Sequence, residues 1–164
     1  MLVEVAAVSI AVLHSLAPDH YVPISAIGKS RKWSLRRTLL FAFVAATIHV
    51  SFSVVIGVLT YLGLDLIGVA EAIEERVPLA LIAFGAFYAV LSIFKPHKHV
   101  RAATATSLLL IIGLSPCVPL IPIMLAADSV GRMLAVAILF SIFTAGTIVF
   151  LTYLSYRAIK PPIY

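Results

Sequence analysis

Long apolar runs constrain this chain more than any other feature of its sequence. Five such runs can be read, at about residues 2–28, 38–63, 77–94, 103–126 and 131–156. A helix needs about 20 apolar residues to cross the hydrocarbon core of a bilayer. Because the runs are apolar on every face, they predict membrane-spanning helices and disfavour the alternating strands of a β-barrel. The sequence therefore predicts an all-α polytopic membrane protein, with a single transmembrane domain over residues 1–164 and about five transmembrane helices.

Composition agrees with this class. Hydrophobic residues make up 62% of the chain and charged residues 12%, whereas about a quarter of a soluble domain is charged. The net charge of +5 does not indicate a nucleic-acid partner, because the basic residues cluster in short segments between the apolar runs, as topology signals do. The single cysteine, Cys117, excludes an intrachain disulfide.

The charged residues also predict an orientation. Basic residues gather on one side of a five-span chain: Lys29, Arg31, Lys32, Arg36 and Arg37, then Lys95, Lys98 and Arg101, then Arg157 and Lys160. Most acids gather on the other side: Glu4, Asp65, Glu71, Glu74, Glu75 and Asp128. Because Lys and Arg remain cytoplasmic, we expect a multi-pass protein of the plasma membrane with its amino terminus outside and its carboxyl terminus in the cytoplasm.

Proline interrupts the first and the fourth run. Pro18 lies in the stretch LHSLAPDHYVP, and Pro116, Pro119 and Pro122 lie in GLSPCVPLIP. Each proline releases a backbone carbonyl, which membrane proteins tolerate only inside protein or beside a wet cavity. The two breaks predict a partial inverted repeat, with units at about 1–95 and 102–157. Paired breaks of this kind are typical of a transporter's central site, although a chance likeness among apolar sequences is the alternative.

Ionisable side chains surround the first break. On an unbroken helix His14, Asp19 and His20 would point in directions differing by roughly 140° and 240°, so only a break at Pro18 would let them converge. His49 adds a third imidazole near the middle of the second run. Imidazole and carboxylate suit divalent Ni, Co or Zn, whereas Mg²⁺ and Ca²⁺ need more oxygen ligands. The sequence therefore predicts a transition-metal site within the membrane.

Simpler interpretations of these residues stay open. His49 could bond another helix, and Asp19 with His20 could form a structural ion pair that caps the broken helix. Cys117 is a candidate metal ligand in the second break, or equally a small buried hydrophobe. His97 and His99 lie among lysines in the segment before the fourth run, which indicates a solvated loop more than a metal-collecting role.

Small residues on the last run bear on assembly. Ala137, Ser141 and Ala145 form a ladder that favours close helix contact. The ladder is compatible with a homodimer and equally with packing inside one subunit.

Three motifs resemble a known family. The segment from His14 to His20 resembles the His-x4-Asp-His signature of nickel/cobalt transporters of the NicO type, which are grouped with LysE-like exporters and with thiol-disulfide carriers related to CcdA. Ser-Pro-Cys-x-Pro, from residue 115 to 119, is similar to the second-half motif of that superfamily. His49 resembles the histidine of a Gly-His-Ser-x-Val-Val motif, with Ile48 in place of the glycine. The resemblance implies a 3+3 inverted repeat, metal transport, and site roles for His14, Asp19, His20 and His49.

From these observations we expect a transporter of Ni²⁺ or Co²⁺, not an enzyme, with the ion as cargo and no permanently bound cofactor. Its partners would be the cation and the lipid bilayer. Three rival functions stay open. The first, a thiol-redox electron carrier, needs two thiols to cycle, and this chain has one. The second is an exporter of a small solute or anion, and the third is a membrane-embedded enzyme.

Overall fold

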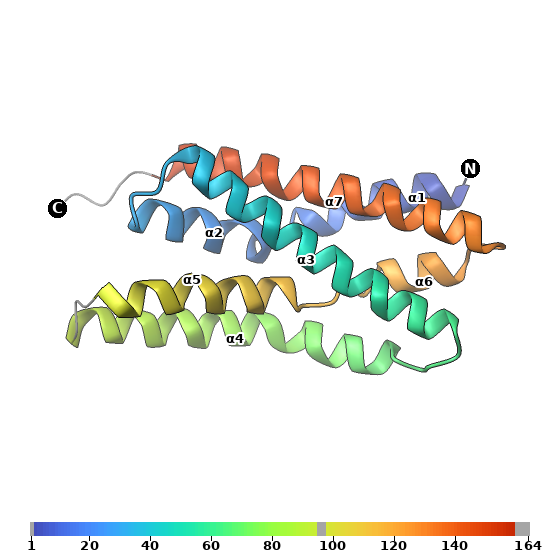
Figure 1. The fold of residues 1–164 in the computed structure, drawn as a ribbon, viewed down its shortest axis with the longest axis horizontal. Coiled ribbons are helices and arrows are strands. Elements are labelled where there is room, and N and C mark those ends of the chain that lie inside the picture. Colours follow the sequence, from blue (N-terminus) through green and yellow to red (C-terminus); the bar gives the residue numbers. More distant parts are fainter. Residues whose placement is uncertain (1, 95–97, 160–164) are drawn as a thin grey trace.

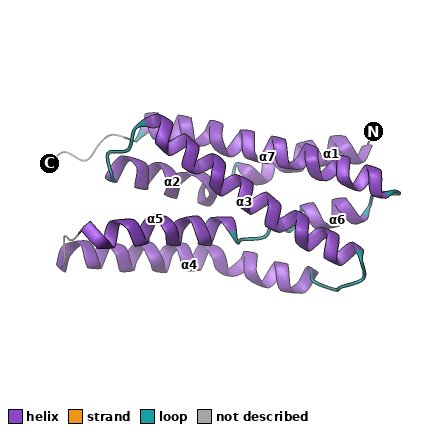
Figure 2. Cartoon of the chain, in the orientation of Figure 1, coloured by secondary structure: helices purple, strands orange, loops and turns teal. Residues whose placement is uncertain are grey.

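The protein is helical throughout the part of the chain that the structure describes. The structure is a computed structural model and describes residues 2–94 and 98–159, with side chains described at 2–87, 90 and 105–159. Figure 2 shows helices joined by short loops. In order they are α1 (Leu2–Ser15), α2 (Pro18–Ser30), α3 (Leu35–Tyr61), α4 (Ile67–Phe94), α5 (Lys98–Gly113), α6 (Leu120–Leu125) and α7 (Val130–Ala158). The predicted all-α class is confirmed.

Length and apolar character single out the helices that could cross a membrane. α3 and α7, with 27 and 29 residues, each meet the requirement alone. α1 and α2 meet it together as a pair bent by 46° at a short break. The described residues therefore hold two candidate spans, or three if the bent pair is one span, and these spans suggest a membrane location.

Two pairs of helices run end to end on either side of α3. Figure 1 shows α1 and α2 lying along α7, while α5 and α6 run along α3 and α4 lies outside them beside α5. On α1 the buried residues Ala7, Ala11 and Ser15 follow one another at a spacing of four, so they occupy one face. Ala7 and Ala11 share a hydrophobic cluster with Val136 and Phe140 of α7. Their small side chains let the two helices approach closely.

The ladder predicted on α7 divides between core and surface. Ala137 is buried in the cluster with α1, whereas Ser141 and Ala145 line an open groove of about 490 Å³ beside Thr47 and Ser51 of α3. Packing inside the subunit thus accounts for the first residue of the ladder. The homodimer stays a prediction.

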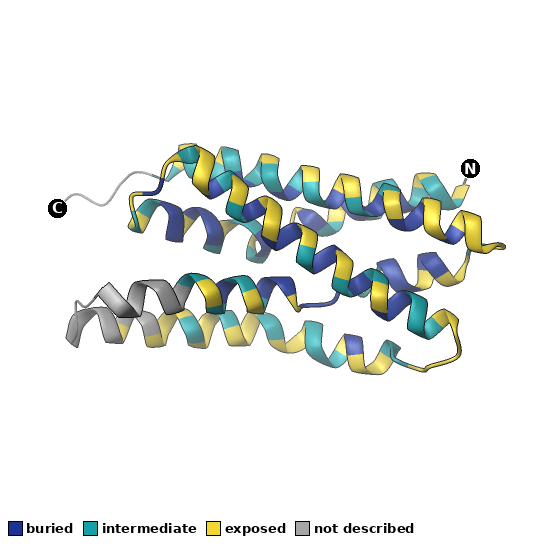
Figure 3. Cartoon of the chain, in the orientation of Figure 1, coloured by how far each residue is buried: buried dark blue, intermediate teal, exposed yellow. Residues whose placement is uncertain are grey.

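The third run differs from its prediction. Its helix, α4, begins at Ile67 and therefore carries Glu71, Glu74 and Glu75 before the predicted start at about residue 77. Glutamate is a good helix former, and Ile67, Ala70 and Ile73 continue the apolar spacing, so the helix can extend past the apolar run. Figure 3 shows that most of the described part of α4 is exposed. Its large apolar side chains there would face lipid.

The predicted loop before the fourth run ends earlier than expected, because α5 begins at Lys98 and therefore contains His99 and Arg101. The side chains of Lys95, His97, Lys98, His99, Arg101 and Lys160 lie outside those that the structure describes.

Candidate metal centre

The first break follows from Pro18. α1 ends at Ser15, and Pro18 occupies the first turn of α2, where its missing N–H removes no helical hydrogen bond. The carbonyl of His14 accepts instead from the Ala17 N–H at 3.2 Å. This bond spans three residues where a helical bond spans four, and it ends α1. The axes of α1 and α2 are bent by 46° at this point. The predicted interruption near Pro18 is confirmed.

The second break is longer and is held by α3. α5 ends at Gly113 and α6 begins at Leu120. Inside the break the Cys117 N–H donates to Ser53 Oγ at 2.7 Å, and the Ser53 hydroxyl donates to the His49 carbonyl at 2.8 Å. Gly113 is required by close packing, because a Cβ there would lie 2.8 Å from Ile48 Cγ2. The second break therefore lies directly against the segment of α3 that carries His49.

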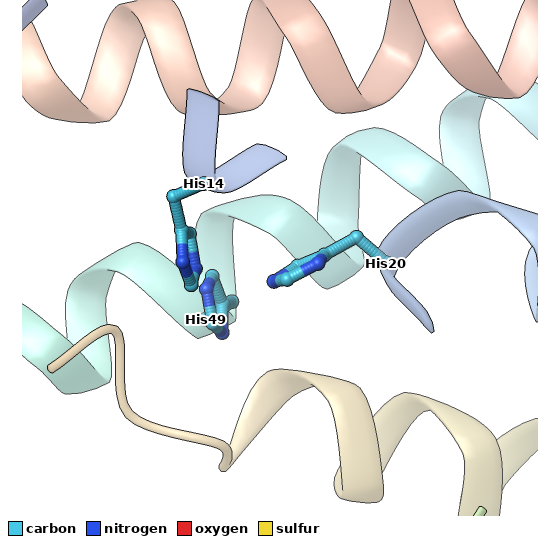
Figure 4. Close-up of side chains that lie close together, drawn as sticks. All are labelled: His14, His20 and His49. Atoms are coloured by element: carbon cyan, nitrogen blue, oxygen red, sulfur yellow. The ribbon is translucent and has the colours of Figure 1, made fainter. Parts of the chain in front are cut away.

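Three imidazoles meet between these elements. His14 from the end of α1, His20 from the first turns of α2 and His49 from the middle of α3 point toward one another (Figure 4). The ring centroids are 4.7 Å apart for His14–His20, 5.2 Å for His20–His49 and 6.0 Å for His14–His49. One nitrogen of each ring lies within 4.8 Å of those of the other two. This buried cluster could bind a metal ion.

The proton on His20 can be assigned from its neighbours. His20 Nδ1 lies 2.9 Å from Asp19 Oδ1 and 3.3 Å from the Ala17 carbonyl. The Ala17 carbonyl accepts a hydrogen from Nδ1, and the Asp19 carboxylate beside it favours the hydrogen on that nitrogen, so in the neutral ring Nε2 keeps its lone pair. A carboxylate that holds one ring nitrogen while the other faces a metal is the usual arrangement at histidine metal sites.

The other two rings present buried nitrogens with no well-formed hydrogen bond, although the backbone of Ile112 and Ser115 lies beside the His49 ring. Among the described residues, His14 Nε2 and both ring nitrogens of His49 are buried without a hydrogen-bond partner, and His49 is only 1% exposed. Leaving a buried polar group unpaired costs about 1–3 kcal/mol. A cation between the rings would satisfy one lone pair on each.

The spacing requires a small adjustment for such an ion. Nitrogens bound at about 2.1 Å in a tetrahedral site lie roughly 3.4 Å apart. The rings are within 4.8 Å by their nearest nitrogens, so inward rotation of the side chains by roughly 1 Å would complete the contact. The cluster offers three nitrogens, and water or a further group would fill the remaining positions.

Two predicted ligands are placed differently from the histidines. Asp19 contacts His20 and does not belong to the group of converging donors. Cys117 is fully buried in an apolar cluster with residues such as Val50 and Leu120, and it does not belong to that group either. The structure thus brings together His14, His20 and His49 and leaves the ligand roles of Asp19 and Cys117 as predictions.

One further acid lies near the site. Glu74 of α4 is half-buried and interacts electrostatically with both Asp19 and His20. From its sequence position alone, Glu74 was expected in a loop before the third span. The signal that could have found it is the helical spacing of Ile67, Ala70 and Ile73, which continues the apolar face of α4 toward the amino terminus.

The chain matches no protein family, no curated protein and no solved structure.

Proposed function

We propose that the protein is a membrane transporter of a divalent transition-metal cation, with Ni²⁺ or Co²⁺ as its cargo. The observation that carries the proposal is the meeting of His14, His20 and His49 between two breaks in membrane helices. Ionisable groups are costly inside a bilayer, so three imidazoles in contact there indicate a function. The bent pair, α3, α4, the broken pair α5–α6 and α7 would form five spans.

The donor set selects the class of ion. Three imidazole nitrogens suit borderline cations such as Ni²⁺, Co²⁺ and Zn²⁺, and they give Mg²⁺ or Ca²⁺ none of the oxygens that those ions require. Zn²⁺ would fit the site as well as Ni²⁺ or Co²⁺ does. The preference for nickel and cobalt rests on the resemblance of the segment His14–His20 to the NicO signature.

Asp19 would act mainly through His20. Its carboxylate lies 2.9 Å from His20 Nδ1, and the negative charge there would favour the hydrogen on Nδ1, leave Nε2 for the ion and make that nitrogen a stronger donor. The ion requires neutral imidazoles, so protons compete with it for the site. Coupling of transport to a proton gradient would follow from this competition. The basic side of the chain would face the cytoplasm.

Paired binding and transport measurements test the proposal. Calorimetry in detergent should show saturable Ni²⁺ binding by the wild type and none by His14→Ala, with no response to Mg²⁺. In proteoliposomes that contain a metal-sensing dye, the wild type should take up Ni²⁺ or Co²⁺ and His14→Ala should not. Gel filtration and a thermal unfolding midpoint would verify that the variant is folded. Equal uptake by both proteins would refute the site, and binding without transport would refute the transporter assignment.

A further inference from the structure

The turn between α2 and α3 has a defined and strained backbone. The Trp33 N–H donates to the Gly28 carbonyl at 2.8 Å and the Lys32 N–H to the Lys29 carbonyl at 3.0 Å. This is the Schellman pattern of a helix end, which requires a left-handed residue, here Lys32 with φ 53°. Glycine usually occupies that position because other residues are strained there. The turn therefore keeps a lysine where a glycine would be easier to accommodate.

Two aromatic residues anchor this turn to the end of α7. Trp33 is buried, with 9% of its surface exposed, and the Tyr156 hydroxyl donates to its backbone carbonyl. Figure 1 shows that the α2–α3 turn and the end of α7 lie at the same end of the bundle. Trp33 and Tyr156 thus form a fixed aromatic pair at that end.

Cationic side chains lie over the rings of this aromatic pair. Lys29 Nζ is 4.2 Å from the centre of the Tyr156 ring, and the guanidinium carbon of Arg37 is 4.7 Å from that of Trp33. The Arg31 guanidinium carbon lies 5.5 Å from the Trp33 ring. An arginine that rests on a ring face keeps N–H donors free at its edge, in an arrangement suited to the oxygens of a phosphate. Arg37 is exposed, so these donors can be reached from outside.

Nothing acidic in the turn offsets this charge. Every carboxylate side chain of the sequence lies elsewhere: Glu4 in α1, Asp19 beside the first break, Asp65 in the α3–α4 loop, Glu71, Glu74 and Glu75 in α4, and Asp128 before α7. The first turn of α3 contains no acid and instead carries Arg36 and Arg37. Cations at a helix amino terminus oppose the dipole, whereas an anion there would be stabilised.

With α3 and α7 spanning the bilayer as proposed, the turn would lie at the depth of lipid headgroups. α3 and α7, with 27 and 29 residues, are about 40 Å long at 1.5 Å per residue, which exceeds the ~30 Å hydrocarbon core. Their ends therefore reach the interface, where tryptophan and tyrosine are enriched. We propose that the α2–α3 turn, with Lys29 and Arg37 held on Tyr156 and Trp33, binds the phosphate of an anionic phospholipid.

Thermal unfolding in detergent tests this site directly. Phosphatidylglycerol added to the micelles should raise the unfolding midpoint of the wild type, whereas phosphatidylcholine and inorganic phosphate at the same concentration should not. Arg37→Gln should weaken the apparent affinity for phosphatidylglycerol by roughly fivefold, the effect of one basic residue at an anionic surface. The matched control is Arg76→Gln, which removes the same charge beside the second break and away from the α2–α3 turn.

Each contrary outcome would overturn the proposal. Equal shifts with both lipids would mean that headgroup charge is not recognised. Equal weakening by Arg37→Gln and Arg76→Gln would mean that only net charge matters. A midpoint rise with inorganic phosphate as large as that with lipid would indicate a soluble anion. If Arg37→Gln does not fold, Lys29→Gln tests the same prediction with the same control.

Discussion

The two helix breaks of this protein are both set by proline but differ in chemistry. The first separates α1 from α2 by only residues 16–17, and His14 and His20 flank it. The second, over residues 114–119, is longer, and its side chains include the buried Pro116 and Cys117. One of its backbone groups, the Cys117 N–H, donates to Ser53 of α3. Proline therefore decides where a membrane helix stops, whereas the flanking side chains decide whether the break can bind a cation.

His49 lies between the breaks, and among the variants that compare the two breaks its removal should have the largest effect on metal binding. Its ring lies near His14 and His20 and also beside the backbone of Ile112 at the end of α5 and of Ser115 in the second break. His49→Ala should lower Ni²⁺ affinity by more than about 100-fold, because two nitrogens hold the ion far less well than three. Calorimetry in detergent measures this loss.

A second histidine variant serves as its control. His99→Ala removes an imidazole from the first turn of α5 and should leave the Ni²⁺ affinity unchanged. If His49→Ala binds Ni²⁺ within about tenfold of the wild type, His49 belongs to the packing of the second break and not to the metal site.

Asp19 should have the next largest effect. Asp19→Asn keeps a side chain that can accept from His20 but removes the charge. Loss of such an orienting carboxylate lowers metal affinity by about 10–100-fold. Asp128→Asn is the control, because Asp128 pairs with Arg132 at 2.7 Å and lies outside the histidine cluster. A loss as large as that of His49→Ala would instead show that Asp19 is itself a ligand.

Much of the first break could be predicted from sequence. Pro18 marks the break, and the phases of His14 and His20 on a helix show that a bend must precede their contact. The length of the apolar runs also predicted that they form helices. These inferences depend on local rules, which the surrounding fold does not overrule.

Side-chain partners were less predictable. Whether Asp19 faces the ion or His20 depends on rotamers set by the packed structure, in which its Oδ1 lies 2.9 Å from His20 Nδ1. The position of Glu74 depends on how far α4 extends beyond its apolar run, and the acidic residues there suggested a loop. The role of Ser53 depends on a contact with Cys117, 64 positions away in sequence.

Ser53 should affect stability more than metal binding. Ser53→Ala leaves the Cys117 N–H buried and unpaired, which costs about 1–3 kcal/mol. Thermal unfolding in detergent should show a lower midpoint for Ser53→Ala than for Ser51→Ala, which removes an exposed hydroxyl from the same helix. Equal midpoints would mean that α3 does not hold the second break in place.

Cys117 should have the smallest effect, and it is the sharpest test of the difference between the breaks. Its side chain is 0% exposed and lies among apolar residues, so it behaves as a small hydrophobe. Cys117→Ala should keep the Ni²⁺ affinity within about twofold of the wild type, because Cys117 lies outside the histidine cluster. Loss of a histidine ligand would lower the affinity far more. A maleimide reagent should label the thiol only after unfolding, because a buried thiol is inert. A large loss of affinity would place a ligand in the second break. Rapid labelling of the folded protein would instead favour a thiol-redox carrier, since exchange chemistry requires an accessible thiolate.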